Sequence, residues 1–154
     1  MSIHTATIRW QCDTGNFADD TYSRGHVWEF DGGAVVAASA APDVVPAPMS
    51  IAENVDPEEA FVASLSSCHM LFFLSFAARR GHCIDEYVDE AVGEMHKDDQ
   101  GRTSITKVTL RPRIVWSGDN LPTEKQKVKL HHQAHNHCFI ANSVKTAIVI
   151  EAVS

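Results

Sequence analysis

Cysteine and histidine are the residue types in this chain whose spacing could support chemistry, and two segments concentrate them. The first, ASLSSCHMLFFLSFAARRG, runs from Ala63 to Gly81 and holds Cys68, with three serines shortly before it and His69 directly after it. Small side chains leave room beside the sulfur for a substrate or another backbone. A reactive thiol also needs a nearby cation or helix N-terminus that favours the thiolate. Taken alone, the segment therefore favours an inert, buried thiol.

The second segment, HHQAHNHCFIANS, contains Cys138. His131 and His135 are four residues apart and share one face of an expected helix, as metal ligands on helices do. Zinc sites with a diagnostic pattern usually bring a CxxC or HExxH motif, and the sequence has neither. Histidines that face solvent or cap the core are the favoured interpretation. A metal site at His131, His135 and Cys138 is the alternative.

The other two cysteines are interpreted as structural. Cys12 lies on the apolar face of an expected strand, and Cys83 follows the predicted end of a helix. A free cysteine packs like a small hydrophobic residue. Because no secretory signal is visible at the N-terminus and the chain is long, we do not expect a framework of structural disulfides.

A long helix is predicted to carry Cys68. Asp56 is a good N-cap, Pro57 suits the first helical position, Glu59 completes a capping box, and Gly81 is a natural stop. The apolar residues between are not confined to one stripe, which indicates a helix that is buried on most sides. In a chain this short, we expect a second subunit to cover it. The serines and the histidine within the helix argue against a membrane span.

The remaining pattern predicts antiparallel sheets and a second helix. Turn signals at Asp31-Gly32-Gly33 and at residues 98–101 separate stretches in which apolar and polar residues alternate. The expected strands lie at 6–12, 22–30, 34–40, 87–97, 103–116 and 146–153, and the helix at 121–135. Pro112 predicts an edge or a bulge. The class is therefore α+β, in a single domain over residues 1–154.

The composition argues against some classes of partner. Of the 154 residues, 44% are hydrophobic and 21% are charged, which is typical of a globular protein. The formal net charge of -7 disfavours nucleic acid and anionic membrane surfaces as partners.

Two segments and their order resemble the osmotically inducible protein C and organic hydroperoxide resistance family (OsmC-like proteins). DPEEAFVASLSSCHM is similar to the family's first-cysteine segment and AHNHCFIANSVK to its second, while YSRGHVWEFDGG occupies the place of the early strand pair. The resemblance covers nearly the whole chain. It implies an OsmC-like fold in which antiparallel sheets pack around long central helices in an intertwined homodimer.

The resemblance also implies a cytoplasmic thiol peroxidase that reduces organic hydroperoxides and hydrogen peroxide without a metal or bound cofactor. Cys68 matches the peroxidatic cysteine, whose thiolate attacks the peroxide. Cys138 matches the resolving cysteine, which forms a disulfide with it. A dithiol donor, such as a dihydrolipoyl protein, then reduces the disulfide. An apolar wall of Phe72, Phe73 and Leu74 suits an alkyl or fatty peroxide.

Two charged residues complete the implied site. Glu58 matches a glutamate that orients an arginine, and Arg24 is the best match for that arginine. Other candidates for the arginine are Arg9 and Arg79. A guanidinium favours the thiolate and needs a carboxylate partner in an apolar pocket. Ten residues of straight helix separate two positions by about 15 Å. If Arg24 contacts both Glu58 and Cys68, we therefore expect the helix to break at Ser64 to Ser67.

Two further functions stay open on the residues alone. One is a non-enzymatic dimer that binds an apolar ligand in the same cleft, with Cys68 in its lining. The other is the metal-binding protein described above. The distance between Cys68 and Cys138 distinguishes these functions from the peroxidase, because disulfide-bonded Cα atoms lie about 5.5–6 Å apart. A close approach of Cys68 and Cys138 favours the peroxidase.

Overall fold

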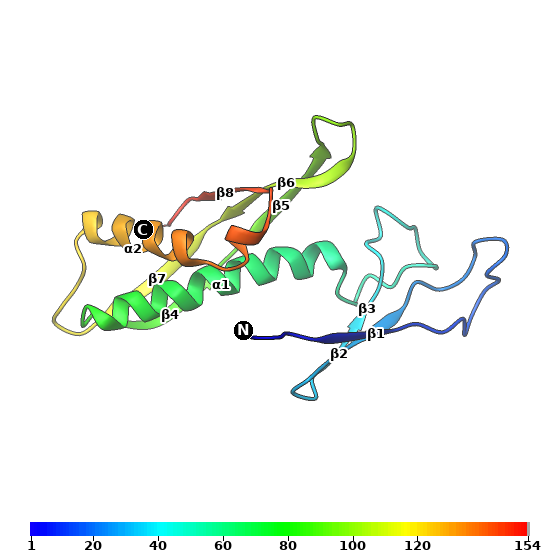
Figure 1. Cartoon of the computed structure of the whole chain (residues 1–154), viewed down its shortest axis with the longest axis horizontal. Helices are drawn as coiled ribbons and strands as arrows, with labels where there is room; N and C mark the ends of the chain where they lie inside the picture. Colours follow the sequence, from blue (N-terminus) through cyan, green and yellow to red (C-terminus); the bar gives the residue numbers. More distant parts are fainter. Residues whose placement is uncertain (154) are drawn as a thin grey trace. The chain divides into compact units, whose positions relative to one another are not determined.

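Three short strands form the sheet of the N-terminal unit, which covers residues 1–60 of the computed structural model (Figure 1). The model describes residues 1–153. Strands β1 (Ala6–Arg9), β2 (His26–Phe30) and β3 (Val35–Ala38) are antiparallel and neighbours in that order. The predicted meander is confirmed, with shorter strands than the alternation indicated.

Neither of the two cysteines interpreted as structural, of which Cys12 was expected in the core, is buried. Cys12 lies in the loop beyond the end of β1, and Cys83 is the first residue of β4 (Cys83–Asp89). Both side chains are exposed. The prediction of buried packing was wrong because β1 ends at Arg9, so no strand face carries Cys12 toward a core.

Helix α1 (Pro57–Arg79) begins and ends where its sequence signals predict. The Asp56 carboxylate accepts a hydrogen bond from the Glu59 backbone at 2.7 Å, and the Glu59 carboxylate accepts one from the Asp56 backbone at 3.2 Å. This reciprocal capping box satisfies two of the N–H groups at the helix start. Gly81 has a φ of 73°, which glycine adopts at low cost, and it ends the helix.

The expected break in α1 is absent. The helix is continuous over 23 residues, and the run of small residues stays within it. The Ser64 hydroxyl donates to the Phe61 carbonyl at 2.8 Å, and the Ser67 hydroxyl donates to the Ser64 carbonyl at 3.4 Å. The serines thus bond to the helix backbone rather than interrupting it.

Two sheets belong to the unit that starts at Phe61. Strand β4 pairs antiparallel with β7 (Pro112–Ser117). The second sheet has the order β5 (Val92–Lys97), β6 (Thr103–Leu110) and β8 (Ala147–Ile150), with β5 antiparallel and β8 parallel to β6. The predicted β5–β6 hairpin is confirmed, but the stretches 87–97 and 103–116 are each divided between the two sheets.

Helix α2 (Glu124–His137) packs against α1 through one of two hydrophobic clusters. Thr123 caps α2 in a box with Gln126, and a short 3-10 helix, η1 (Ala141–Ser143), follows it. The first cluster joins the C-terminal half of α1 to α2, β4 and β7 and is centred on Phe73, Ala77, Leu130 and Ala134. The second joins the N-terminal half of α1 to β6 and β8 and is centred on Leu65, Val108 and Leu110. Helix α1 is therefore the element common to both clusters.

Only one stripe of α1 is buried within the chain. Leu65, His69, Phe73 and Ala77 follow one another at four-residue intervals and face the clusters. On another side of the helix, Leu71 is 63% exposed. By length and composition α1 could also cross a membrane, a property that it shares with core helices of soluble proteins.

Candidate active site

The structure brings Cys68 and Cys138 together. Cys68 lies in the middle of α1, where it is half-buried, and Cys138 is the C-cap of α2, where it is 1% exposed. The Cys68 thiol lies near enough to Cys138 to raise the pKa of the Cys138 thiol, and both are free thiols. The backbone N–H of Ala141 also donates to the Cys138 sulfur at 3.4 Å. The two cysteines of this pair, alone among the four, come from two helices that are remote in sequence.

The two thiols differ in accessibility and in acidity. Burial, followed by the interaction with the Cys68 thiol, raises the pKa of the Cys138 thiol to about 11. Cys138 therefore stays a protonated donor at neutral pH, while the half-buried Cys68 is the more accessible sulfur. The Cys68 sulfur can therefore react with a molecule from solution, whereas the buried Cys138 sulfur can react with Cys68.

Aromatic side chains stand beside the thiol pair. Phe72 is four residues after Cys68 and so shares its side of α1. The ring of Phe72 meets the edge of Phe139, the residue after Cys138, at a centroid distance of 5.0 Å. Phe139 was not expected from the sequence, although its place next to Cys138 was the available signal. Phe73 does not belong to this wall, because it is fully buried in the core on the neighbouring stripe.

The histidine that follows Cys68 faces the core. Nε2 of His69 lies 3.1 Å from Nδ1 of His131 on α2, and both side chains are buried. Burial, followed by the nearby His131 and His135, lowers the pKa of His69 to about 4. Burial likewise lowers the pKa of His131 to about 4. Over residues 1–153, no three His, Cys, Asp or Glu side chains are grouped so that they could hold a metal ion.

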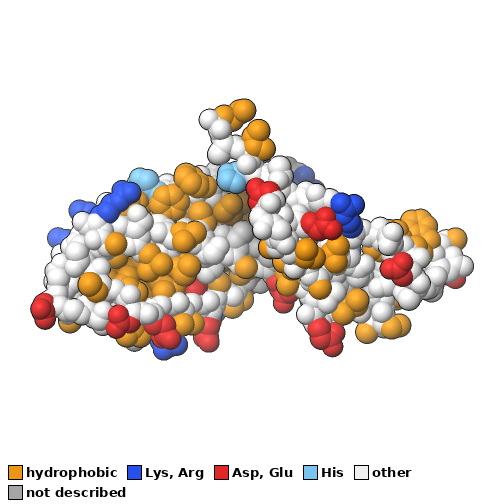
Figure 2. Space-filling model, turned by 90° about the horizontal axis from the view of Figure 1, so that it is seen from below, with side chains coloured by type: hydrophobic (Ala, Val, Ile, Leu, Met, Phe, Trp, Pro, Cys, Tyr) orange, Lys and Arg blue, Asp and Glu red, His pale blue; other side chains and the backbone are white. Residues whose placement is uncertain are grey.

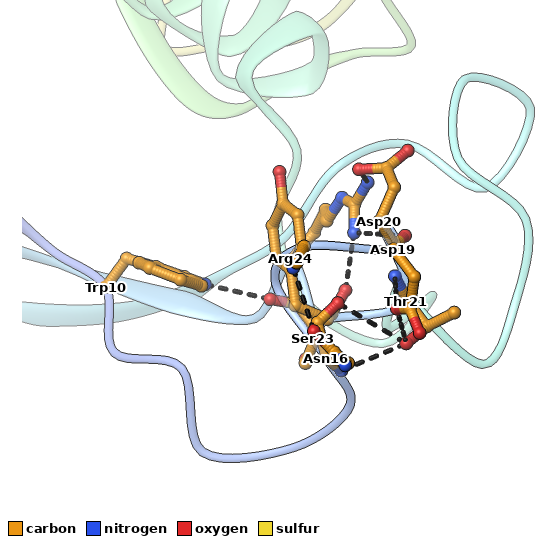
Figure 3. A network of polar contacts seen from close by, with 9 residues as sticks. Trp10, Asn16, Asp19, Asp20, Thr21, Ser23 and Arg24 are labelled. Carbon is orange, nitrogen blue, oxygen red and sulfur yellow. Dashed lines mark hydrogen bonds and ion pairs between the residues drawn. The ribbon is translucent and has the colours of Figure 1, made fainter.

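Arg24 is held within the N-terminal unit by the loop that precedes it, as Figure 3 shows. One guanidinium nitrogen, Nη2, donates to the Asp20 carboxylate at 2.6 Å. The other, Nη1, donates to the carbonyls of Asp20 and Tyr22 at 3.2 and 2.5 Å. The guanidinium lies over the Tyr22 ring, 3.6 Å from its centroid. Among the described residues, its carboxylate partner is Asp20, which the sequence did not suggest.

Glu58 lies in the first turn of α1 and is half-buried. Because α1 is continuous, ten helical residues separate it from Cys68, which corresponds to about 15 Å. One arginine of the same chain therefore cannot contact both. The two alternative arginines are exposed: Arg9 pairs with Glu29 at 2.9 Å, and Arg79 lies over the Phe76 ring.

Comparison with known proteins agrees with this fold. The profile of the family described as OsmC-like protein matches residues 52–153. A search of curated protein sequences gives no match. The chain belongs to the OsmC-like family.

Solved structures of three similar proteins carry the same fold. An OsmC-like protein of unknown function from Vibrio cholerae is 55% identical, with a TM-score of 0.97 over 99% of this chain and 100% of that one. The organic hydroperoxide resistance protein OhrB of Bacillus subtilis is 18% identical, with a TM-score of 0.69 over 99% and 98% of the two chains. An organic hydroperoxide resistance protein OsmC from Legionella pneumophila is 14% identical, with a TM-score of 0.68 over 99% and 96%. Because the last two proteins are only 18% and 14% identical to this chain, their similarity shows the fold alone.

Proposed function

We propose that the protein is a two-cysteine thiol peroxidase that reduces organic hydroperoxides in defence against oxidative stress. The proximity of the Cys68 and Cys138 thiols is the observation that carries the proposal. Membership of the OsmC-like family supports it, since two more distant relatives with the same fold are named for organic hydroperoxide resistance. Hydrogen peroxide is a second, smaller substrate of the same chemistry.

Cys68 is the attacking residue in this proposal because it is the accessible thiol of the pair. Its thiolate attacks the distal oxygen of the hydroperoxide, so that an S–O bond forms while the O–O bond breaks. The alkoxide that leaves takes up a proton and departs as the alcohol. Cys68 is thereby oxidised to a sulfenic acid by two electrons, and the hydroperoxide is reduced by the same two.

Cys138 then resolves the sulfenic acid. Its sulfur attacks the Cys68 sulfur, an S–S bond forms, and the hydroxyl leaves with the Cys138 proton as water. Until that step, the raised pKa of Cys138 keeps its proton in place. An external dithiol, of the dihydrolipoyl class, restores both thiols by disulfide exchange. Such donors fit a protein of the reducing cytoplasm.

Arg24 and Glu58 enter the site from a second copy of the chain in this proposal. The continuous α1 argues for this, because within one chain Glu58 and Cys68 lie too far apart along the helix for one guanidinium. Arg24 of the second copy stabilises the Cys68 thiolate and polarises the peroxide, while Glu58 orients that arginine.

The apolar surface of α1 supports the homodimer on which this arrangement depends. Figure 2 shows hydrophobic side chains gathered on one side of the molecule, toward the end at which α1 stops. Leu71 on α1 and Phe139 after α2 are 63% and 71% exposed. A contiguous apolar patch on a soluble protein commonly marks an interface.

Mapping the disulfide tests the proposal. The reduced protein receives one equivalent of hydroperoxide and is digested after its remaining thiols are blocked. We expect a Cys68–Cys138 peptide, while the exposed Cys12 and Cys83 serve as internal controls and remain blocked as free thiols. Oxidation that is spread over Cys12 and Cys83, with Cys68 still free, would contradict the proposal and favour a cleft that binds an apolar ligand.

A further inference from the structure

A pocket with an aromatic wall opens beside Arg24 in the N-terminal unit. Its volume is about 410 Å³, which is within the range of sites that bind one small molecule. Its lining is largely apolar and includes Ile8, Trp10, Phe17, Tyr22, Arg24 and Pro57. All of these residues lie within residues 1–60, so the pocket belongs to one unit of the chain.

Three aromatic rings form one cluster at this pocket. Phe17 stacks on Tyr22 at a centroid distance of 4.9 Å, and Trp10 and Tyr22 form a T-shaped contact at 5.3 Å. The indole N–H of Trp10 donates to the Ser23 carbonyl at 2.8 Å, which fixes the ring (Figure 3). Phe17 nevertheless remains 63% exposed. An ordered but uncovered aromatic surface of this kind is suited to contact with a further ring.

The guanidinium of Arg24 is the cationic group of the lining, which also includes the polar residues His26 and Ser39. Arginine has five N–H donors, and three of them bond to Asp20 and Tyr22. Among the described residues, Nε–H and one Nη2–H have no acceptor. The side chain is only 15% exposed, so a ligand that accepts from these donors replaces little bulk solvent. The pocket therefore combines an apolar, aromatic wall with two hydrogen-bond donors.

This combination discriminates between classes of ligand. A cationic ligand is disfavoured, because Arg24 itself already lies over the face of Tyr22 at 3.6 Å. A small polar peroxide satisfies the donors but leaves the rings uncovered. A molecule with an aryl group and a peroxide satisfies both, since its oxygens accept from Arg24 while its ring packs on the aromatic wall.

We propose that this pocket selects hydroperoxides in which an aryl group lies close to the O–O bond. The aryl ring packs against the exposed ring of Phe17, which stacks on Tyr22, and Arg24 donates to the peroxide oxygens. The inference rests on the proposed function, in which Arg24 serves the Cys68 of a second copy. It adds the substrate class, and it assigns Phe17 and Tyr22 as specificity-determining residues.

The selectivity is tested with two hydroperoxides, one with an aryl ring and one without. Rate constants for thiol oxidation are measured with cumene hydroperoxide and with tert-butyl hydroperoxide, and each is divided by the rate constant for free cysteine. The wild type is expected to prefer the cumene compound by about tenfold. Phe17→Leu is expected to lower this preference by between about twofold and tenfold, the range that one aromatic contact supplies. Tyr22→Leu provides a second, independent variant.

Phe30→Leu is the matched control, because Phe30 is 40% exposed on β2 and does not line the pocket. It is expected to keep the wild-type preference. Equal normalised rates for the two hydroperoxides in the wild type would overturn the proposal. A preference that survives both Phe17→Leu and Tyr22→Leu would also overturn it.

A binding measurement separates this inference from the peroxidase itself. Cys68→Ser protein is mixed with the alcohol product 2-phenyl-2-propanol, and transfer of magnetisation from protein to ligand is followed by NMR. We expect transfer to the phenyl protons and its loss when Phe17→Leu is added. Binding without any peroxide consumption would contradict the proposed function and leave the aryl pocket standing. Peroxide consumption without ring contact would overturn the pocket and leave the function standing.

Discussion

His69 and His131 form a buried hydrogen bond between the two helices that carry the thiols. The atoms Nε2 and Nδ1 are 3.1 Å apart, and the two rings are within 8° of parallel. A hydrogen bond between two imidazoles needs one donor and one acceptor, so a doubly protonated pair cannot form it. The contact between α1 and α2 at this point therefore requires that at least one of the two histidines is neutral.

The free energy of unfolding is predicted to decrease as the pH is lowered below about 6.5, which is the ordinary pKa of histidine. Both pKa values are lowered in the folded protein, to about 4, so the unfolded state binds more protons between these limits. The stabilisation is complete above pH 6.5 and is lost as the pH falls toward 4. With both histidines titrating, the slope approaches about 2.7 kcal/mol per pH unit. Urea unfolding between pH 7.5 and 5, at fixed protein concentration, measures it.

Two asparagine variants separate this effect from general acid sensitivity. His131→Asn removes one buried titrating group and is expected to reduce the slope by about half. His132→Asn, at the exposed neighbouring position on α2, is the matched control and is expected to keep the wild-type slope. A stability that does not change between pH 7 and 5 would contradict the buried, neutral pair.

The local features of the fold could be predicted from sequence, whereas the pairing of remote segments could not. The capping box of α1 depends on Asp56 and Glu59, three residues apart, and was predicted correctly. The His69–His131 bond joins residues 62 positions apart and depends on how α2 packs against α1. The parallel pairing of β8 with β6 likewise depends on tertiary packing. The period-2 pattern gave no sign of it.

Leu130 is predicted to anchor α2. Its side chain is fully buried among Phe73, Ala77 and Ala134, so Leu130→Ala leaves a cavity at the contact between α1 and α2. The free energy of unfolding should fall by about 2–5 kcal/mol. The control Leu121→Ala makes the same chemical change at a position that is 59% exposed, and it should stay within about 0.5 kcal/mol of wild type. Equal effects in urea unfolding would contradict the packing described.

Leu71 is predicted to lie in the homodimer interface. It is 63% exposed on the long apolar helix, and Leu71→Lys places a charge there that a dry interface cannot solvate. Sedimentation equilibrium should show a dimer for the wild type and a monomer for the variant. Val128→Lys, on α2 at a position that is 69% exposed, should remain dimeric. A monomeric wild type, or a dimeric Leu71→Lys variant, would show the expected assembly to be wrong.

Arg24, and not Arg9, is predicted to accelerate the reaction of Cys68 with the peroxide. Arg24 is partly buried and keeps free donors, whereas Arg9 is exposed and paired with Glu29 on the sheet. Arg24→Gln should slow the oxidation of Cys68 by cumene hydroperoxide on the order of a hundredfold, because it removes a positioned cation. Arg9→Gln should react like wild type. If Arg9→Gln or Arg79→Gln were the slow variant instead, the assignment would move to that residue.

The candidate site shows the same division between what sequence does and does not predict. Cys68 and Cys138 were chosen by the resemblance of their segments, and the fold places the two thiols near each other. Periodicity alone put Cys12 in a core, which failed because the strand ends three residues earlier. Asp20 as partner of Arg24 was not expected, since its ion pair forms within an irregular loop. Such loops have no periodicity from which side-chain direction can be inferred.

Counting thiols after exposure to one equivalent of cumene hydroperoxide tests the central claim most directly. The reduced chain has four cysteines. The account predicts the rapid loss of two thiols in the wild type and of none in Cys68→Ser. In Cys138→Ser it predicts a sulfenic acid that dimedone traps on Cys68. Loss of thiols in the wild type no faster than in free cysteine would contradict the account, and Cys68 would then be part of the lining of a cleft that binds an apolar ligand.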